Sequence, residues 1–137
     1  MKIHFALPKD FASTRKLDRK LTSSQIRKKI FAREFVIAIE EGRVIGCLRF
    51  EWMWLKIPYL TWISVVPQSQ RSGVAAALLR FLAASLKKKR RGFLLNSYQE
   101  NAPIAKSWHQ SVGFRRCGQI RELNRDGSQE IFCRLSL

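Results

Sequence analysis

The chain has 137 residues, 46% of them hydrophobic, a length that suits one globular domain without metal or disulfide support. Its 26 Lys and Arg against 10 Asp and Glu give a formal net charge of +16, which attracts polyanions such as nucleotides or nucleic acid. No stretch approaches the roughly 18 consecutive apolar residues of a membrane span, and no secretory signal opens the chain. We therefore expect a cytoplasmic protein that does not bind a membrane.

The cysteine pattern favours neither a metal site nor a disulfide framework. Cys47, Cys117 and Cys133 are odd in number and widely spaced, and no C-x-x-C pair occurs. We expect three reduced cysteines that serve packing, and no bound metal.

The first third of the chain predicts a strand followed by two helices. Residues 2–6 carry a short strand pattern, and residues 10–20 carry a weak helical one. Thr22 followed three residues later by Gln25 fits a capping box, so a helix should begin there. This helix has a basic face, which fits a solvated surface or a surface that attracts anions.

A hairpin and a third strand should follow this helical region. Residues 35–39 and 44–54 are strand-like and flank a turn at Gly42, which predicts an antiparallel pair. Alternation places three aromatic side chains on one face of the second strand: Phe50, Trp52 and Trp54. Residues 59–66 predict the next strand, which Pro67 ends.

The junction after Pro67 predicts a strand, a tight loop and a helix. Helical spacing begins directly after the loop, at Ala75, Leu78, Leu79, Leu82 and Leu86. The unpaired N–H groups of a first helical turn attract phosphate, Gly73 allows close approach, and Arg71 adds a charge. The residues alone leave two interpretations, an anion site or an ordinary turn whose glycine relieves crowding.

The last third of the chain predicts a strand, a helix and a final hairpin. The run 87–91 (KKKRR) fits either a solvated helix end or an anion-attracting patch. After a strand at 93–97, Asn101 can cap a helix whose inward residues are Ile104, Ala105, Trp108 and Val112. Two strands then flank Asp126-Gly127, and the whole order is that of a mixed α+β fold.

Two motifs resemble those of the GCN5-related N-acetyltransferase (GNAT) superfamily. Gln70 to Ala75 (QRSGVA) resembles the Q/R-x-x-G-x-G/A loop, and Val65-Val66-Pro67 is similar to the V-x-P signature before it. Residues 101–114 resemble the second family block, an Asn-led helix that ends in Gly-Phe. The resemblance implies a single N-acetyltransferase domain over residues 1–137, with a mostly antiparallel sheet whose strands 4 and 5 splay apart. It also implies acetyl-CoA as co-substrate and a primary amine of a small molecule or protein as acceptor.

The resemblance also implies positions for the site. In the family the loop holds the pyrophosphate, the fourth strand aligns the pantetheine, and an asparagine meets the pantetheine arm. The implied cofactor-binding residues are Ile63, Ser64, Val65, Gln70, Arg71, Ser72, Gly73, Val74, Ala75 and Asn101.

Catalytic residues follow less directly from the resemblance. The family tyrosine that protonates the leaving thiolate corresponds in position to His109, whose reference pKa of about 6.5 suits a proton donor. A helix-surface histidine without a role is the alternative. The family's usual glutamate base is replaced by Ser64 and Asn96, which leaves Glu51 and Glu100 as the nearest substitutes.

Two rival functions remain open on the same fold. The net charge and the run 87–91 suit a nucleic-acid or ribosome binder, and the missing tyrosine and glutamates suit a catalytically silent CoA-binding module. The acceptor and the choice between monomer and homodimer are left open.

Overall fold

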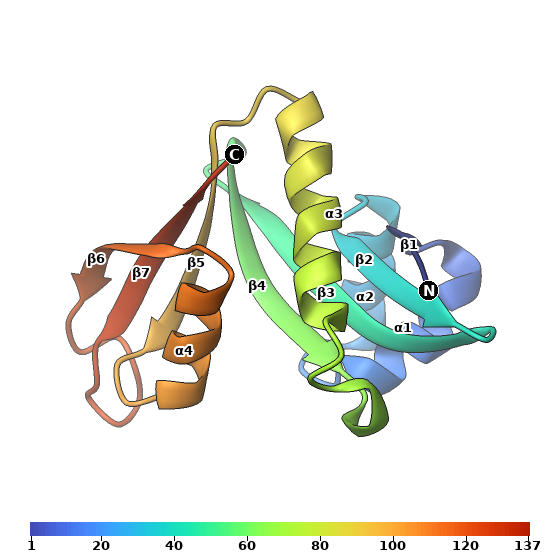
Figure 1. The fold of residues 1–137 in the computed structure, drawn as a ribbon, viewed down its shortest axis with the longest axis horizontal. Coiled ribbons are helices and arrows are strands. Elements are labelled where there is room, and N and C mark those ends of the chain that lie inside the picture. Colours follow the sequence, from blue (N-terminus) through green and yellow to red (C-terminus); the bar gives the residue numbers. More distant parts are fainter.

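One seven-stranded sheet organises the molecule, in a computed structural model that describes residues 1–137 (Figure 1). Its strands lie in the order β1-β2-β3-β4-β5-β7-β6, and every neighbouring pair is antiparallel except β4 and β5. The strands are β1 (Lys2–Phe5), β2 (Phe35–Glu40), β3 (Arg43–Met53), β4 (Ile57–Val65), β5 (Phe93–Gln99), β6 (Arg115–Ile120) and β7 (Glu130–Ser136). The predicted mixed α+β order is therefore confirmed.

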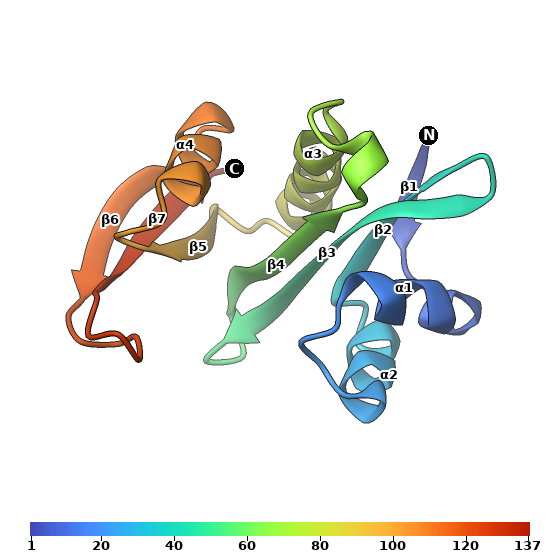
Figure 2. The ribbon, with the colours of Figure 1, turned by 90° about the horizontal axis from the view of Figure 1, so that it is seen from below.

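Helices cover both faces of the sheet. The helical elements are η1 (Pro8–Asp10), α1 (Phe11–Leu17), α2 (Ser23–Phe31), η2 (Pro67–Ser69), α3 (Val74–Lys88) and α4 (Pro103–Ser111). Figure 2 shows α1 and α2 on one face, with α3 and α4 on the other. None of the helices has both the length and the apolarity needed to cross a membrane.

Each face of the sheet has its own hydrophobic core. The larger core packs α3 against the central strands, and four of the five residues of the predicted helical stripe belong to it: Leu78, Leu79, Leu82 and Leu86. The smaller core lies under α2 around Ile26, Phe35 and Ile37, which are fully buried. Burial of such side chains contributes about 1.5–3 kcal/mol each, so both helical layers are held firmly against the strands.

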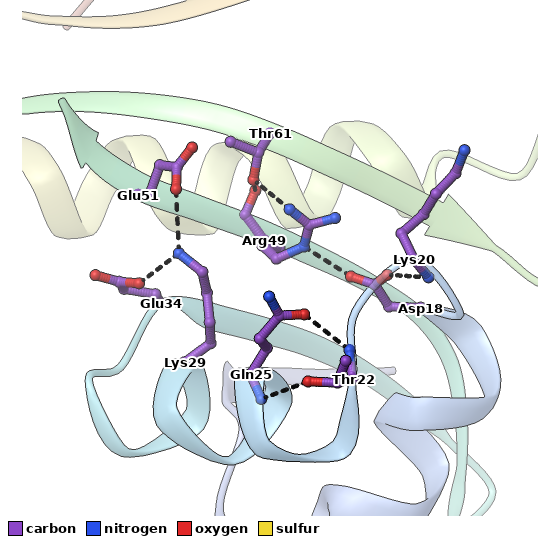
Figure 3. A network of polar contacts seen from close by, with 9 residues as sticks. All are labelled: Asp18, Lys20, Thr22, Gln25, Lys29, Glu34, Arg49, Glu51 and Thr61. Atoms are coloured by element: carbon purple, nitrogen blue, oxygen red, sulfur yellow. Dashed lines mark hydrogen bonds and ion pairs between the residues drawn. The ribbon is translucent and has the colours of Figure 1, made fainter.

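The predicted capping box opens α2. The backbone N–H of Gln25 donates to the Thr22 hydroxyl at 3.2 Å, and the backbone N–H of Thr22 donates to the Gln25 side chain at 2.9 Å (Figure 3). The reciprocal bonds satisfy donors that a helix end leaves free.

Strands β4 and β5 run parallel but diverge, as the resemblance implied (Figure 1). Only Tyr59 and Leu95 are paired between them. A bulge at Thr61 also interrupts β4, because Arg49 pairs with Trp62 whereas the next residue of β3, Phe50, pairs with Leu60. Bulges bend the strand that carries them. The two strands thus part on one side of their single contact and leave room for a cleft.

Three predicted placements differ in the structure. Trp54 does not continue the aromatic face of β3, because the strand ends at Met53 and Trp54 lies 75% exposed in the turn to β4. Ile104 is 86% exposed rather than inward-facing, since the buried side of α4 centres on His109. Asn101 does not cap α4, which begins after Ala102 without a side-chain cap.

Candidate active site

A cleft of about 920 Å³ lies where β4 and β5 separate, and 18 residues line it. Strand β4 supplies one wall, and β5 with α4 supplies the other. Five of the ten predicted cofactor-binding residues line the cleft, and four of them come from β4 and the loop after it: Ile63, Ser64, Val65 and Gln70. Ala75 also lines it, so this residue faces the cleft rather than the core that the helical stripe predicted.

Gly73 shapes the loop that enters α3. Its φ of 85° is left-handed, and a Cβ built there would meet nothing within 4 Å. A side chain at this position would therefore be strained and would project into open space in front of the loop. The glycine therefore does not relieve crowding within the protein, and its left-handed φ is what favours glycine at this position.

Hydrogen bonds inside the loop fix its shape. The Gln70 side chain donates to the carbonyl of Val65 at 3.0 Å, which ties the loop to the end of β4. The Ser72 hydroxyl donates to the carbonyl of Ser69 at 2.5 Å. Arg71, with a left-handed φ of 61°, is exposed and has no carboxylate within ion-pair distance. The loop is built without acidic groups and leaves one free guanidinium.

The N-terminus of α3 has the physical features of an anion site. The first N–H groups of a helix have no partner inside it, and the helix dipole is positive at this end. Gly73 leaves the space before them open, and Arg71 supplies a mobile positive charge beside it. Val74, the remaining predicted loop residue, is buried in the core and anchors the helix rather than contacting a ligand by its side chain.

His109 lies deeper than the sequence suggested. Its side chain lines the cleft, yet the residue is only 6% exposed, so it is not a surface histidine. The ring contacts three aromatic neighbours, with centroid distances of 5.0 Å to Tyr98, 5.2 Å to Trp108 and 5.4 Å to Phe114. The helix thus brings the residue to the cleft, and aromatic packing fixes the ring.

The hydrogen bond of His109 sets its tautomer. Nδ1 lies 2.5 Å from the carbonyl of Ala105, and a carbonyl only accepts, so Nδ1 carries the proton. Nε2 is buried and has no partner. Burial lowers the pKa of His109, although the Ala105 carbonyl acts in the opposite direction. The ring is therefore neutral near pH 7, and its free nitrogen is an acceptor rather than a donor.

Of the predicted residues outside the loop at Gly73, two do not line the cleft. The Asn101 amide donates to Asp126 at 3.1 Å, joining α4 to the β6–β7 connection. Glu51 faces Lys29 at 3.4 Å, and Lys29 also pairs with Glu34 at 2.8 Å (Figure 3). The structure thus gives Asn101 a loop contact and Glu51 an ion pair, and neither contact supports the role that the sequence suggested.

Glu130 is the one carboxylate that lines the cleft, and the sequence analysis did not single it out. It opens β7, opposite Gln99 of β5. Burial raises its pKa, and one carboxylate oxygen, Oε1, is buried without a hydrogen-bond partner. Strand alternation could have identified Glu130 from the sequence. Ile131 and Cys133 are buried on one face of β7, so Glu130 lies on the other.

Residues 32–116 match the family described as "Acetyltransferase (GNAT) domain", which is more than half of the chain. A search of curated protein sequences finds no match. No group of three His, Cys, Asp or Glu side chains comes together as metal ligands.

Solved structures share the fold at low sequence identity. A ribosomal-protein-alanine N-acetyltransferase from Brucella melitensis is 15% identical over the whole of both chains, with a TM-score of 0.83. Ard1 from Thermoplasma volcanium is 15% identical over 99% of this chain and 97% of its own, with a TM-score of 0.84. A chain of the NatC complex bound to Gag peptide and CoA is 16% identical over 100% of this chain and 99% of its own, with a TM-score of 0.78.

The loop at Gly73, the parted parallel strands and the family match agree with one another. The chain belongs to the GNAT family and is an acetyl-CoA-dependent N-acetyltransferase.

Proposed function

We propose that this enzyme transfers the acetyl group of acetyl-CoA to a primary amine by direct attack of the amine on the thioester. The observation that carries the proposal is the continuity of the cleft with the loop at the head of α3. A diphosphate at the loop would direct the thioester along β4. Positioning alone contributes roughly 7–11 kcal/mol to such a reaction, so few catalytic side chains are needed.

The proposed cofactor contacts follow the geometry of the loop and strand. Backbone N–H groups at the start of α3 would hold the diphosphate, with Arg71 beside them. Edge groups of β4 at Ile63, Ser64 and Val65 would align the pantetheine, because these residues line the cleft where the β5 partner is missing. Asn101 would need to leave Asp126 to take part.

His109 is the proposed proton carrier for the leaving thiolate. Its neutral ring must first take a proton at Nε2, and the same nitrogen can then pass that proton to sulfur. Nε2 is covered in this structure, so access requires a shift of the surrounding aromatic rings. With this order of proton transfers, the His109 ring is neutral both before and after turnover.

A protein N-terminus is the acceptor that similar structures favour. Two of them are described as ribosomal-protein-alanine and ribosomal-protein-S18-alanine N-acetyltransferases, and a third binds a Gag peptide. A small-molecule amine is the alternative, since the loops that would select an acceptor carry no recognised motif.

Thiol release from acetyl-CoA tests the function. Purified enzyme is incubated with acetyl-CoA and a panel of alanine-led peptides, lysine peptides and small amines, and CoA affinity is measured by calorimetry. Acetylation of at least one amine supports the proposal. CoA binding without thiol release on any acceptor would instead identify a silent CoA-binding module.

A polyanion-binding surface is a second candidate function, and a specific cluster favours it. Lys89 and Arg91, after the end of α3, lie 5.8 Å and 5.1 Å from the ring of Trp52. Neither has a carboxylate within ion-pair distance. Two residues along the chain, the β3–β4 turn presents Trp54 and the 93% exposed Leu55. A half-buried tryptophan beside two free cations, with an exposed tryptophan two residues further along the chain, suits stacking and phosphate contact in nucleic acid.

This basic end is separate from the phosphate loop. Helix α3 has 15 residues, which at 1.5 Å per residue places its ends about 22 Å apart. Replacing Lys87, Lys88 and Lys89 by Gln should weaken binding of a single-stranded oligonucleotide and flatten its salt dependence while acetyl transfer continues. A matched triple change at the exposed Lys2, Lys9 and Arg43 controls for net charge. Equal loss in both triples would show only a general charge effect.

A further inference from the structure

Glu130 lies where the cleft opens on the face of the sheet opposite α3. Along β7, Ile131 and Cys133 are buried on one face of the strand, so Glu130 and Phe132 point the other way. On that face the Phe132 ring lies 6.2 Å from the ring of Tyr59, whose hydroxyl is hydrogen-bonded to Ser97. Helices α1 and α2 cover the β1–β3 part of this face, whereas β5 and β7 are left free of helices there (Figure 2).

No group of the protein donates a hydrogen bond to the buried oxygen of the Glu130 carboxylate. Oε1 is buried without a partner, and no Lys, Arg or His lies within ion-pair distance of the side chain. Leaving such an acceptor unpaired destabilises the folded protein, and more so when the group is charged. A group kept in this state is compensated only by a donor that arrives from outside the chain.

The charge around the cleft is the reverse of the charge of the whole protein. Lys and Arg make up 26 of the 137 residues, yet none of the 18 residues that line the cleft is Lys or Arg. Burial raises the pKa of Tyr59, and although the Ser97 hydrogen bond lowers it, the negative charges of Glu130 and Glu51 raise it further. The cleft lining thus holds one carboxylate and no Lys or Arg, an arrangement that favours a cation beside Glu130.

We propose that Glu130 binds the protonated amine of the acceptor and takes a proton from it before attack. The inference rests on the proposed function and names its substrate class, an amine that arrives as an ammonium ion. It is independent of His109, which belongs to α4 on the opposite face of the sheet and packs against Tyr98, Trp108 and Phe114 (Figure 2).

The proposed step is balanced. One N–H bond of the ammonium breaks, its proton forms an O–H bond with Glu130, and the freed lone pair attacks the thioester carbon. The new C–N bond forms as the C–S bond breaks. A second N–H bond of the attacking nitrogen then breaks to leave the neutral amide, and the proton it releases passes to the thiolate. The desolvated position of Glu130 raises its pKa, which brings the carboxylate closer to the pKa of the amine and makes it a better base.

The test compares two acceptors with different amine pKa values. One is a lysine-free peptide with a free α-amine, of pKa about 7.7–8.0, and the other is an N-acetylated peptide with one lysine, of pKa about 10.4. Glu130→Gln should lower kcat/KM by about 10²-fold or more at pH 7, as expected for loss of a general base. The deficit on the α-amine should shrink at pH 9, where solvent has already removed the proton.

The other titratable groups near Glu130 are Tyr59 of β4 and Glu51 of β3. Tyr98 and His109 also line the cleft. Their own titration is common to the wild type and the variant, so the ratio of the two profiles isolates Glu130. Glu130→Asp keeps the negative charge but shortens the side chain by one methylene, so its kcat/KM should be lower by about tenfold or more.

Matched measurements separate this inference from the function on which it rests. Glu40→Gln removes an exposed carboxylate at the end of β2 and should leave kcat/KM unchanged. CoA affinity should be equal in all variants. A folded Glu130→Gln enzyme within twofold of wild type on every acceptor would overturn the assignment of Glu130 alone. A wild-type enzyme that acetylates no amine would overturn the proposed function and this assignment together.

Discussion

Arg49 and Asp18 form a buried ion pair, with Nε donating to the carboxylate at 2.7 Å, behind the strand that forms one wall of the cleft (Figure 3). Asp18 is fully buried and Arg49 is 9% exposed. The same guanidinium donates to the Thr61 hydroxyl at 3.1 Å, and that hydroxyl donates to the Arg49 carbonyl. Because Thr61 is the bulge residue of β4, the pair links the end of α1 to the shape of the cleft.

Breaking this pair should be costly. Arg49→Met leaves the Asp18 carboxylate buried without a cation, so the free energy of unfolding should fall by about 3–5 kcal/mol. The double variant Arg49→Met with Asp18→Leu should lose much less than the sum of the single changes. Urea denaturation of the four proteins gives the coupling energy, and a single-variant loss below about 1 kcal/mol would contradict the prediction.

Gly73→Trp should abolish CoA binding. The indole would occupy the open space before the first turn of α3, where the diphosphate is proposed to lie. Calorimetry should show at least a hundredfold loss of affinity.

Gly42 offers a matched control for that change. It also has a left-handed φ, 75°, with open space around its Cβ position, but it lies in the β2–β3 turn. Gly42→Trp should impose similar backbone strain of about 1–3 kcal/mol and leave CoA affinity unchanged. Wild-type affinity in Gly73→Trp would place the diphosphate elsewhere.

His109 should make the protein less stable below about pH 6.5. Burial lowers its pKa, so the unfolded chain binds more protons than the folded one between the lowered pKa and the ordinary value of 6.5. Stability is therefore full above this window and is lost as the pH falls through it. Urea midpoints at pH 7.5 and pH 5.5 should differ more in wild type than in His109→Phe. The raised pKa of Glu130 acts in the opposite sense but is common to both proteins.

Turnover should also depend on His109. Loss of a positioned proton carrier typically lowers the rate by about 10²–10⁴, so His109→Ala should lower kcat with little change in acetyl-CoA binding. His109→Tyr should restore part of kcat. Steady-state and single-turnover kinetics check this, and a wild-type kcat in His109→Ala would leave solvent as the proton source.

One cysteine should react in the native protein. Cys117 is exposed, whereas burial raises the pKa of Cys47 and Cys133 to about 12, which suppresses their thiolates. An aromatic disulfide reagent should titrate one thiol before denaturation and three after it. Fast reaction of two or more thiols would show that the core opens readily.

Local signals predicted the parts of the fold that local physics decides. The Thr22–Gln25 capping box and the loop between Pro67 and the start of α3 are each specified within a few residues, and both are present. Trp54 was misplaced because it and Leu55 adopt left-handed backbone at φ 53° and 62° without a glycine or asparagine to signal a turn.

Long-range pairing decides the rest of the site. Glu130 reaches the cleft only because β7 inserts between β5 and β6, and no local pattern encodes that order. The depth of His109 depends likewise on Tyr98 and Phe114, which come from strand β5 and the residue before β6. Glu51 had seemed available because the sequence does not show that Lys29 would face it from α2.

The single pairing of Tyr59 with Leu95 divides the sheet into two parts that are joined through one pair of residues. The part formed by β1–β4 packs against α3, and the part formed by β5–β7 packs against α4 and contains Glu130. Backbone hydrogen bonds hold each part together, but few cross between β4 and β5, so the backbone opposes a hinge motion at this pair only weakly. Such a hinge motion would change the distance between the loop at Gly73 and the Glu130 carboxylate, and with it the distance between the bound cofactor and the acceptor amine.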